Sequence, residues 1–382
     1  MYELLAAVVL TQFSLFDAED NVNCIYGTGK VGIRSCGDII HSLQLNGSPI
    51  SRSDLAAIFH RRANHYFSSG NNELAFSDFD TAIKLAPDFA PAFLDRGSAY
   101  ASQGDYELAI EDWTRVLELD ESNFDARFKR ALLYVRQSRY EDALLDLALA
   151  INLRPKFADA YIKRGSVYLL MGRLSDAIAD FNQALSLEPS SEAAYFYRGM
   201  AQVQLGLFGK ANADFDEAVK LGSEDDRALV ARGASFIELG QFHSALADAD
   251  TFLRKQPGDA FGHLVRGRAF ASLGRHDLAV EDYDRIIGLD PSNLDALNNR
   301  AWSYLKLKKL QLGLRDAEMA VQLAPNNFFA WDTLGSIREA LGDQALAIEA
   351  YARANRLDPS HEMSKEHLDR LGTMQKSTSG AQ

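Results

Sequence analysis

The sequence contains few cysteines and prolines, and it has no long apolar run. Its 382 residues include 2 cysteines and 9 prolines. No stretch approaches the roughly 18–20 apolar residues that a membrane-spanning helix needs, so we expect no integral membrane span. Positive charge is also scarce, and the net charge is −13. Because phosphate binding requires clustered Lys and Arg, this balance argues against nucleic acid as a partner.

Both cysteines, Cys24 and Cys36, lie within the first 55 residues. An even count in one short segment indicates a local disulfide if the compartment is oxidising, and two buried thiols otherwise. The stretch LLAAVVL at 4–10 reads either as the apolar core of a signal peptide or as an ordinary apolar helix, since no Lys or Arg precedes Lys30. These features together favour a periplasmic or exported protein over a cytoplasmic one.

The chain has a 34-residue period. Counted from Ala56 as position 1, nine repeats follow without a gap and end at residue 361. Position 8 is always Gly or Ala, position 20 is always small, and position 11 is aromatic in seven repeats. Seven of the nine prolines fall at position 32. The period predicts one structural unit per repeat.

Each repeat is predicted to form two short helices. Apolar residues recur at spacings of three and four, which is the helical period. Glycine at position 15 of seven repeats indicates the end of the first helix, because a left-handed residue after a helix favours glycine. Proline at position 32 cannot continue the second helix but can open the next repeat. The predicted fold class is therefore all-α.

These positions resemble the tetratricopeptide repeat, a 34-residue helix–turn–helix with the same small, aromatic and proline sites. The resemblance covers residues 56–361 as nine repeats. It implies a right-handed superhelical solenoid in which the first helix of each repeat lines the concave face and the second lies outside.

Position 7 is arginine and position 23 is aspartate in repeats one to eight, whereas repeat nine has Leu334 and Ala350. Because the two residue types appear and vanish together, we predict that they pair within each repeat. The planar guanidinium can donate two hydrogen bonds to one carboxylate. Such a pair would join the two helices of a repeat, and because it neutralises both charges we do not expect it to form a ligand site. The predicted pairs are Arg62–Asp78, Arg96–Asp112, Arg130–Asp146, Arg164–Asp180, Arg198–Asp214, Arg232–Asp248, Arg266–Asp282 and Arg300–Asp316.

Both ends depart from the period. Residues 1–55 are predicted to hold a degenerate capping repeat whose second helix, 31–43, carries Cys36, with Cys24 just before a shortened partner helix. Residues 362–372 are predicted to form a polar C-terminal capping helix, and 373–382 a disordered tail.

No catalytic or metal-binding constellation is visible. GTGK at 27–30 lacks two of the residues that define a phosphate-binding loop. His60 and His65 are five residues apart, whereas two metal ligands on one helix face need a spacing of four. We predict no enzymatic activity, no cofactor and no small-molecule substrate.

The resemblance places positions 2, 5, 6, 9, 12 and 13 of the first helix in the concave groove. A carboxylate clamp known in the family is doubtful here, because Asp95 and Asp125 stand where it has an amide and a cation. Repeats three to six carry an apolar set typical of protein-binding surfaces, about half of which we expect to be exposed. Polar positions such as Asn298 and Asn299 are expected to flank it. The predicted groove residues are Phe128, Leu132, Val135, Ile162, Leu169, Phe196, Tyr197, Met200, Val203, Val230 and Ile237.

The sequence thus predicts a non-enzymatic scaffold that binds a peptide or helix of a partner protein in its concave groove. The alternative is a chaperone-like assembly factor of the cell envelope that uses the same groove for transient clients.

Overall fold

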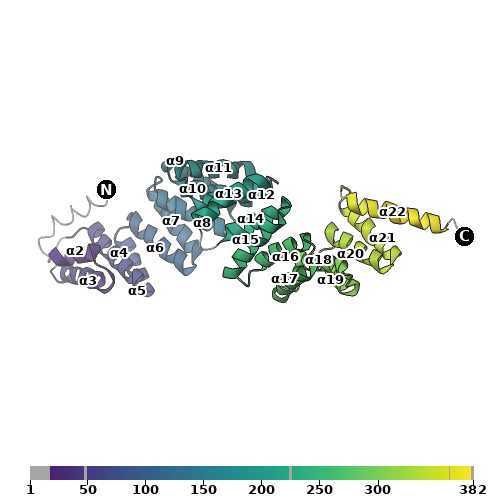
Figure 1. Cartoon of the computed structure of the whole chain (residues 1–382). Coiled ribbons are helices and arrows are strands. Elements are labelled where there is room, and N and C mark those ends of the chain that lie inside the picture. Colours follow the sequence, from purple (N-terminus) through teal and green to yellow (C-terminus); the bar gives the residue numbers. More distant parts are fainter. Residues whose placement is uncertain (1–17, 47–49, 223–225, 361, 380–382) are drawn as a thin grey trace. The chain divides into compact units, whose positions relative to one another are not determined.

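The computed structural model describes residues 18–46, 50–222, 226–360 and 362–379. Among these residues it contains helices and no strand (Figure 1). The signal-like stretch at 4–10 lies outside the described residues. The chain divides into two compact parts, which we call the N-terminal half, up to Leu187, and the C-terminal half, from Glu188.

Each of the nine repeats forms one pair of helices. The first helices of the pairs are α4 (Arg52–Ser68), α6 (Ala90–Gln103), α8 (Phe124–Arg136), α10 (Ala158–Leu170), α12 (Glu192–Gln204), α14 (Arg227–Glu238), α16 (Ala260–Ser272), α18 (Leu294–Lys306) and α20 (Phe328–Leu341). The second helices are α5 (Asn72–Leu85), α7 (Tyr106–Leu119), α9 (Tyr140–Leu153), α11 (Leu174–Leu187), α13 (Phe208–Leu221), α15 (Phe242–Lys255), α17 (His276–Leu289), α19 (Leu310–Leu323) and α21 (Gln344–Leu357).

The pairs stack into a solenoid within each half. Consecutive helices pack against each other, and first helices of adjacent repeats also touch, as α16 does with α18 and α18 with α20. Small residues at position 8 permit the close approach. A Cβ built on Gly165 would lie 2.7 Å from Cε1 of Phe181, and one on Gly267 would lie 2.7 Å from Cε1 of Tyr283. The ring at position 24 therefore packs directly on the backbone of its partner helix.

The residue at position 15 ends the first helix in a left-handed conformation. All seven glycines at this position have positive φ, including Gly172 at 72° and Gly274 at 76°. The two repeats without glycine adopt the same turn, with Ser138 and Lys308 both at φ 59°. A side chain in this region costs about 1–2 kcal/mol, because its Cβ crowds the following carbonyl oxygen.

We therefore expect Ser138→Gly and Lys308→Gly each to raise the free energy of unfolding by about 0.5–1 kcal/mol, after subtraction of the extra chain entropy that glycine loses on folding. Both side chains are exposed, so no packing is lost. Chemical denaturation measures the change. Ser138→Ala is the control, because it removes the hydroxyl but keeps the Cβ. A gain equal to that of glycine would contradict the explanation.

The N-terminal cap consists of α2 (Ala18–Tyr26) and α3 (Gly29–Asn46). Cys24 lies within α2, not before it as predicted, because α2 begins at Ala18, ahead of the cysteine. Its sulfur is joined to that of Cys36 on α3 by a disulfide with an S–S distance of 2.08 Å. Both cysteines are buried beside Ile39, Leu43 and Ile58, so the cap shares an apolar cluster with α4.

The last helix, α22 (Glu362–Ser379), packs on α21. It continues beyond residue 372, where we predicted that a disordered tail begins. No proline follows Gly372, and one glycine costs a helix only about 1 kcal/mol, which does not by itself end it.

Candidate functional site

The arginines at position 7 and the aspartates at position 23 lie in bidentate pairs in repeats one to eight. Each arginine donates through Nε and one terminal nitrogen to both oxygens of the aspartate sixteen residues later, at 2.6–2.9 Å. The aspartates are buried, as Asp146 and Asp282 are at 1% exposure each. We call this row of pairs the arginine ladder. Hydrogen bonds to Asp282 raise the pKa of Arg266 above its ordinary value, although burial opposes them.

The ladder also joins neighbouring repeats, a contact that we did not predict from the sequence. The remaining terminal nitrogen of four arginines donates to an aspartate at position 25 of the preceding repeat, at 2.6–3.0 Å. The corresponding nitrogen of Arg130 donates to the hydroxyl oxygen of Thr114, which occupies the same position 25. The sequence feature that could have predicted this contact is the recurrence of aspartate at position 25, as Asp80, Asp216, Asp250 and Asp284. Each guanidinium already binds both oxygens of a buried carboxylate, which favours a structural role for the ladder over a ligand site.

The apolar residues predicted to line the groove are less exposed than expected. Ile162, Val230 and Ile237 are buried. The other eight are half-buried, so the expectation that about half would be exposed was wrong. Phe128, for example, packs with Phe124 of the same helix, α8, and with Phe157, which lies just before α10.

The groove residues fall in both halves. Phe128, Leu132, Val135, Ile162 and Leu169 belong to the N-terminal half. In the C-terminal half, Phe196, Met200 and Val203 pack against the buried cluster of Ala211, Phe215 and Ala231. Tyr197 lies beside Phe196, with 5.3 Å between ring centroids.

The clamp positions of repeats one and two hold an internal hydrogen-bond cluster. Nε2 of His60 lies 2.7 Å from Oδ2 of Asp95, and Nδ2 of Asn64 donates to the same oxygen at 2.8 Å. Burial alone would raise the pKa of Asp95, but these hydrogen bonds and the nearby Lys129 hold it below its ordinary value. The carboxylate is thus already satisfied within the protein, which disfavours an incoming carboxylate at this place.

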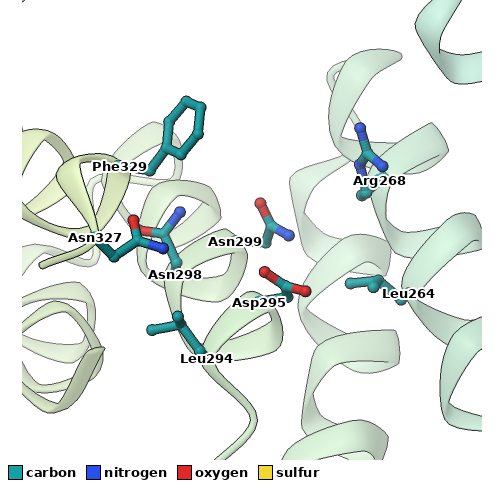
Figure 2. A pocket seen from close by; sticks show the side chains of 8 residues that line it. All are labelled: Leu264, Arg268, Leu294, Asp295, Asn298, Asn299, Asn327 and Phe329. Atoms are coloured by element: carbon teal, nitrogen blue, oxygen red, sulfur yellow. The ribbon is translucent and has the colours of Figure 1, made fainter. Parts of the chain in front are cut away.

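A cavity of about 300 Å³ lies on the first helices of the C-terminal half. We call it the amide pocket. Figure 2 shows Asp295 and Asn299 of α18 between side chains of α16 and of the α20 region. The lining residues are Leu264, Arg268, Leu294, Asp295, Asn298, Asn299, Asn327 and Phe329. They occupy mainly positions 2, 5, 6 and 9 of their repeats, which are the groove positions that the family resemblance implies.

The amide pocket offers uncommitted polar groups beside apolar ones. Within the described residues, the buried Oδ1 of Asn298 has no hydrogen-bond partner. Asp295 is exposed and forms no ion pair there, whereas Arg268 is paired with Glu238 at 2.8 Å. Phe329 is 55% exposed at the edge. Asn298 and Asn299 were expected only as flanking residues, since a single sequence does not reveal which polar side chains lack a partner.

No group of three or more His, Cys, Asp or Glu among the described residues could hold a metal ion. In the same part of the chain, no helix combines the length and the apolar character required to cross a bilayer.

Models of the tetratricopeptide repeat match residues 97–138, 158–191, 230–294, 264–328 and 330–361. No curated protein matches the chain. Among solved structures, a tetratricopeptide repeat protein from Parabacteroides merdae is 20% identical and aligns over 66% of this chain and 99% of its own, with a TM-score of 0.54. The APC/C hetero-tetramer Cut9–Hcn1 matches over 97% of this chain and 94% of the matched chain, with 13% identity and a TM-score of 0.54.

The chain is a tetratricopeptide-repeat protein with an all-α solenoid fold. This fold generally serves as a non-enzymatic scaffold, and the repeats support a role in protein–protein interaction with protein or peptide partners.

Proposed function

We propose that this protein is a non-enzymatic scaffold that holds an extended segment of a partner protein in the groove formed by its first helices. The observation that carries the proposal is the amide pocket. Asn298 and Asn299 both line it, and the buried Oδ1 of Asn298 has no partner within the described residues. A buried polar atom without a hydrogen bond costs about 1–3 kcal/mol, which is recovered when the amide turns its oxygen towards a ligand donor in the pocket.

The chemistry of the pocket fits a peptide main chain. An asparagine side chain offers both a donor and an acceptor, as a peptide group does. Leu264 and Phe329 supply apolar contact for a side chain of the segment. A pre-formed solenoid surface needs little reordering when it binds, so such a site loses little entropy.

The half-buried apolar residues extend the proposed surface within each half. Phe196, Tyr197, Met200 and Val203 on α12 belong to the same half as the amide pocket, and Phe128, Leu132, Val135 and Leu169 serve the N-terminal half. Partner binding by a structural neighbour gives further support, since Cut9 was crystallised together with Hcn1.

The test is a pull-down from the native host with wild type, Asn298→Ala/Asn299→Ala and Phe196→Lys/Met200→Lys. We expect a defined partner that wild type retains and the asparagine variant loses at least tenfold, because two hydrogen bonds to the main chain are removed. The control is Leu312→Ser, which changes an exposed residue of the second helix α19. Each variant must keep the helical melt of wild type.

Equal retention by wild type and both groove variants would contradict the proposal and place binding outside the groove. A broad set of weakly held proteins, all lost in the groove variants, would instead favour the chaperone-like assembly factor.

A further inference from the structure

The arginine ladder stops at repeat nine, and a cavity lies where its next member would be. Leu334 replaces the arginine of position 7 and Ala350 replaces the aspartate of position 23. A cavity of about 450 Å³ is lined by both residues. Its other lining residues are Glu318, Val321, Gln322, Trp331, Arg338, Leu346 and Glu349. We call it the ladder cavity, and it shares no lining residue with the amide pocket.

Repeats one to eight show what occupies the equivalent place. The guanidinium there lies between the carboxylate of position 23 and, in four repeats, a carboxylate at position 25 of the preceding repeat. It also lies over the aromatic ring at position 4 in repeats one, two, four and five, 5.3–5.8 Å from the ring centroid.

The ladder cavity keeps two of these three neighbours, the carboxylate of position 25 and the aromatic ring of position 4, and it lacks the aspartate of position 23 as well as the arginine. Glu318 occupies position 25 of repeat eight, and Trp331 occupies position 4 of repeat nine. Leu334 and Ala350 are buried at 3% and 2% exposure and form an apolar floor. Leu346, 44% exposed, extends that floor towards solvent. Such a surface fits the methylene stem of a long cationic side chain.

The charges of the ladder cavity favour a cation. Glu318 accepts a hydrogen bond from Arg338 at 3.1 Å, which leaves Glu349 as the second carboxylate. Glu349 is exposed and forms no ion pair in the described part of the chain. Two carboxylates against one guanidinium give the cavity a net negative charge, and this disfavours a phosphate or carboxylate ligand.

We propose that the ladder cavity takes an arginine side chain from a partner protein, which occupies the place that repeats one to eight fill with their own arginine. Arginine fits better than lysine for two reasons. Its planar fork can donate two hydrogen bonds to one carboxylate, and its flat face stacks on an aromatic ring such as Trp331. The contact lies outside the groove site, so it adds a second point of attachment for a protein bound to this scaffold.

The test uses the full-length protein with N-acetyl-arginine amide as the probe. Titration is followed through the NMR signals of the methyl groups of Val321, Leu334 and Leu346. We expect saturable shifts at millimolar concentrations of the arginine probe. N-acetyl-citrulline amide, which has nearly the same shape without the charge, should bind at least tenfold more weakly, and N-acetyl-lysine amide about fivefold more weakly.

Two variants test the site itself. Glu349→Gln, an exposed substitution that leaves the fold intact, should weaken the arginine probe about three- to tenfold. Leu334→Arg/Ala350→Asp supplies the missing ladder pair and should abolish binding. Asn298→Ala in the amide pocket should leave the titration unchanged, so that failure here is distinct from failure of the groove proposal.

Equal binding of the citrulline probe, or undiminished binding by Glu349→Gln, would overturn the proposal. Lysine binding as tight as arginine binding would also overturn it, because the site would then recognise positive charge alone.

Discussion

Replacement of Asp282 by alanine is expected to lower the free energy of unfolding by about 3–5 kcal/mol. Asp282 is 1% exposed, and it accepts two hydrogen bonds from Arg266 at 2.7 and 2.9 Å. Its Oδ1 also lies 2.7 Å from Nδ1 of the buried His263. The substitution leaves the guanidinium and the imidazole beside each other without their shared carboxylate. Chemical denaturation, with hydrogen exchange in α16 and α17, measures the loss.

Matched substitutions isolate the cause. Asp277→Ala changes an exposed carboxylate on the same helix, α17, and should shift stability by less than about 0.5 kcal/mol. Asp248→Ala should cost less than Asp282→Ala. Each change leaves an arginine that keeps a second carboxylate, Asp216 for Arg232 and Asp250 for Arg266, but of the two aspartates Asp282 alone also binds a buried histidine. An equal loss at all three positions would contradict the explanation.

The pair Arg164–Asp180 also allows a clean double-mutant cycle. Position 25 of the preceding repeat is Ala148, so no carboxylate stands there for Arg164. Arg164→Leu/Asp180→Ala should therefore be milder than the sum of the two single changes. Additive losses would show that the two side chains do not interact.

Reduction of the Cys24–Cys36 disulfide is expected to destabilise the N-terminal cap by about 3 kcal/mol, the typical value for a closed loop of this length. The two cysteines are 12 residues apart in sequence, and the bond is the covalent link between α2 and α3. Hydrogen exchange in α2 and α3 should accelerate when a reductant is added, while α20 and α21 should be unaffected because stability in a stacked array is largely local.

The control for this prediction is Cys24→Ala/Cys36→Ala, whose exchange should be fast with or without reductant. A thiol assay on protein purified from its own compartment decides whether the bond forms there. Exchange in α2 and α3 that the reductant leaves unchanged would contradict the prediction. Two free thiols in the native protein would remove the support that the cysteine pair gives to export.

Much of the local structure could be predicted from the sequence because the same residue pattern occurs in nine repeats. Position 30 ends every second helix, as at Leu187 and Leu289. The pairing of Arg62 with Asp78 could be inferred from co-occurrence alone, because both residues vanish together in repeat nine. The left-handed turns at Ser138 and Lys308 also follow the glycines of the other repeats, since one backbone geometry must be conserved for the helices to stack.

The candidate sites were less predictable. Whether Ile162 is buried and Phe329 is exposed depends on how side chains of adjacent first helices interdigitate. This interdigitation cannot be predicted from a single sequence. The partnerless oxygen of Asn298 and the ladder cavity beside Ala350 are likewise products of packing. Each is a place that no neighbouring side chain fills, so it depends on how closely the helices of adjacent repeats pack.

The sequence by itself determined the repeat, its register, its helix ends and the residues of the arginine ladder. These depend on backbone propensity and on the 34-residue period, which act within one repeat. Only the tertiary structure decided that the ladder also bridges neighbouring repeats, which apolar residues are covered, and where cavities remain. Those features arise because each repeat buries its surface against the next, and the fit between two particular neighbours differs along the array.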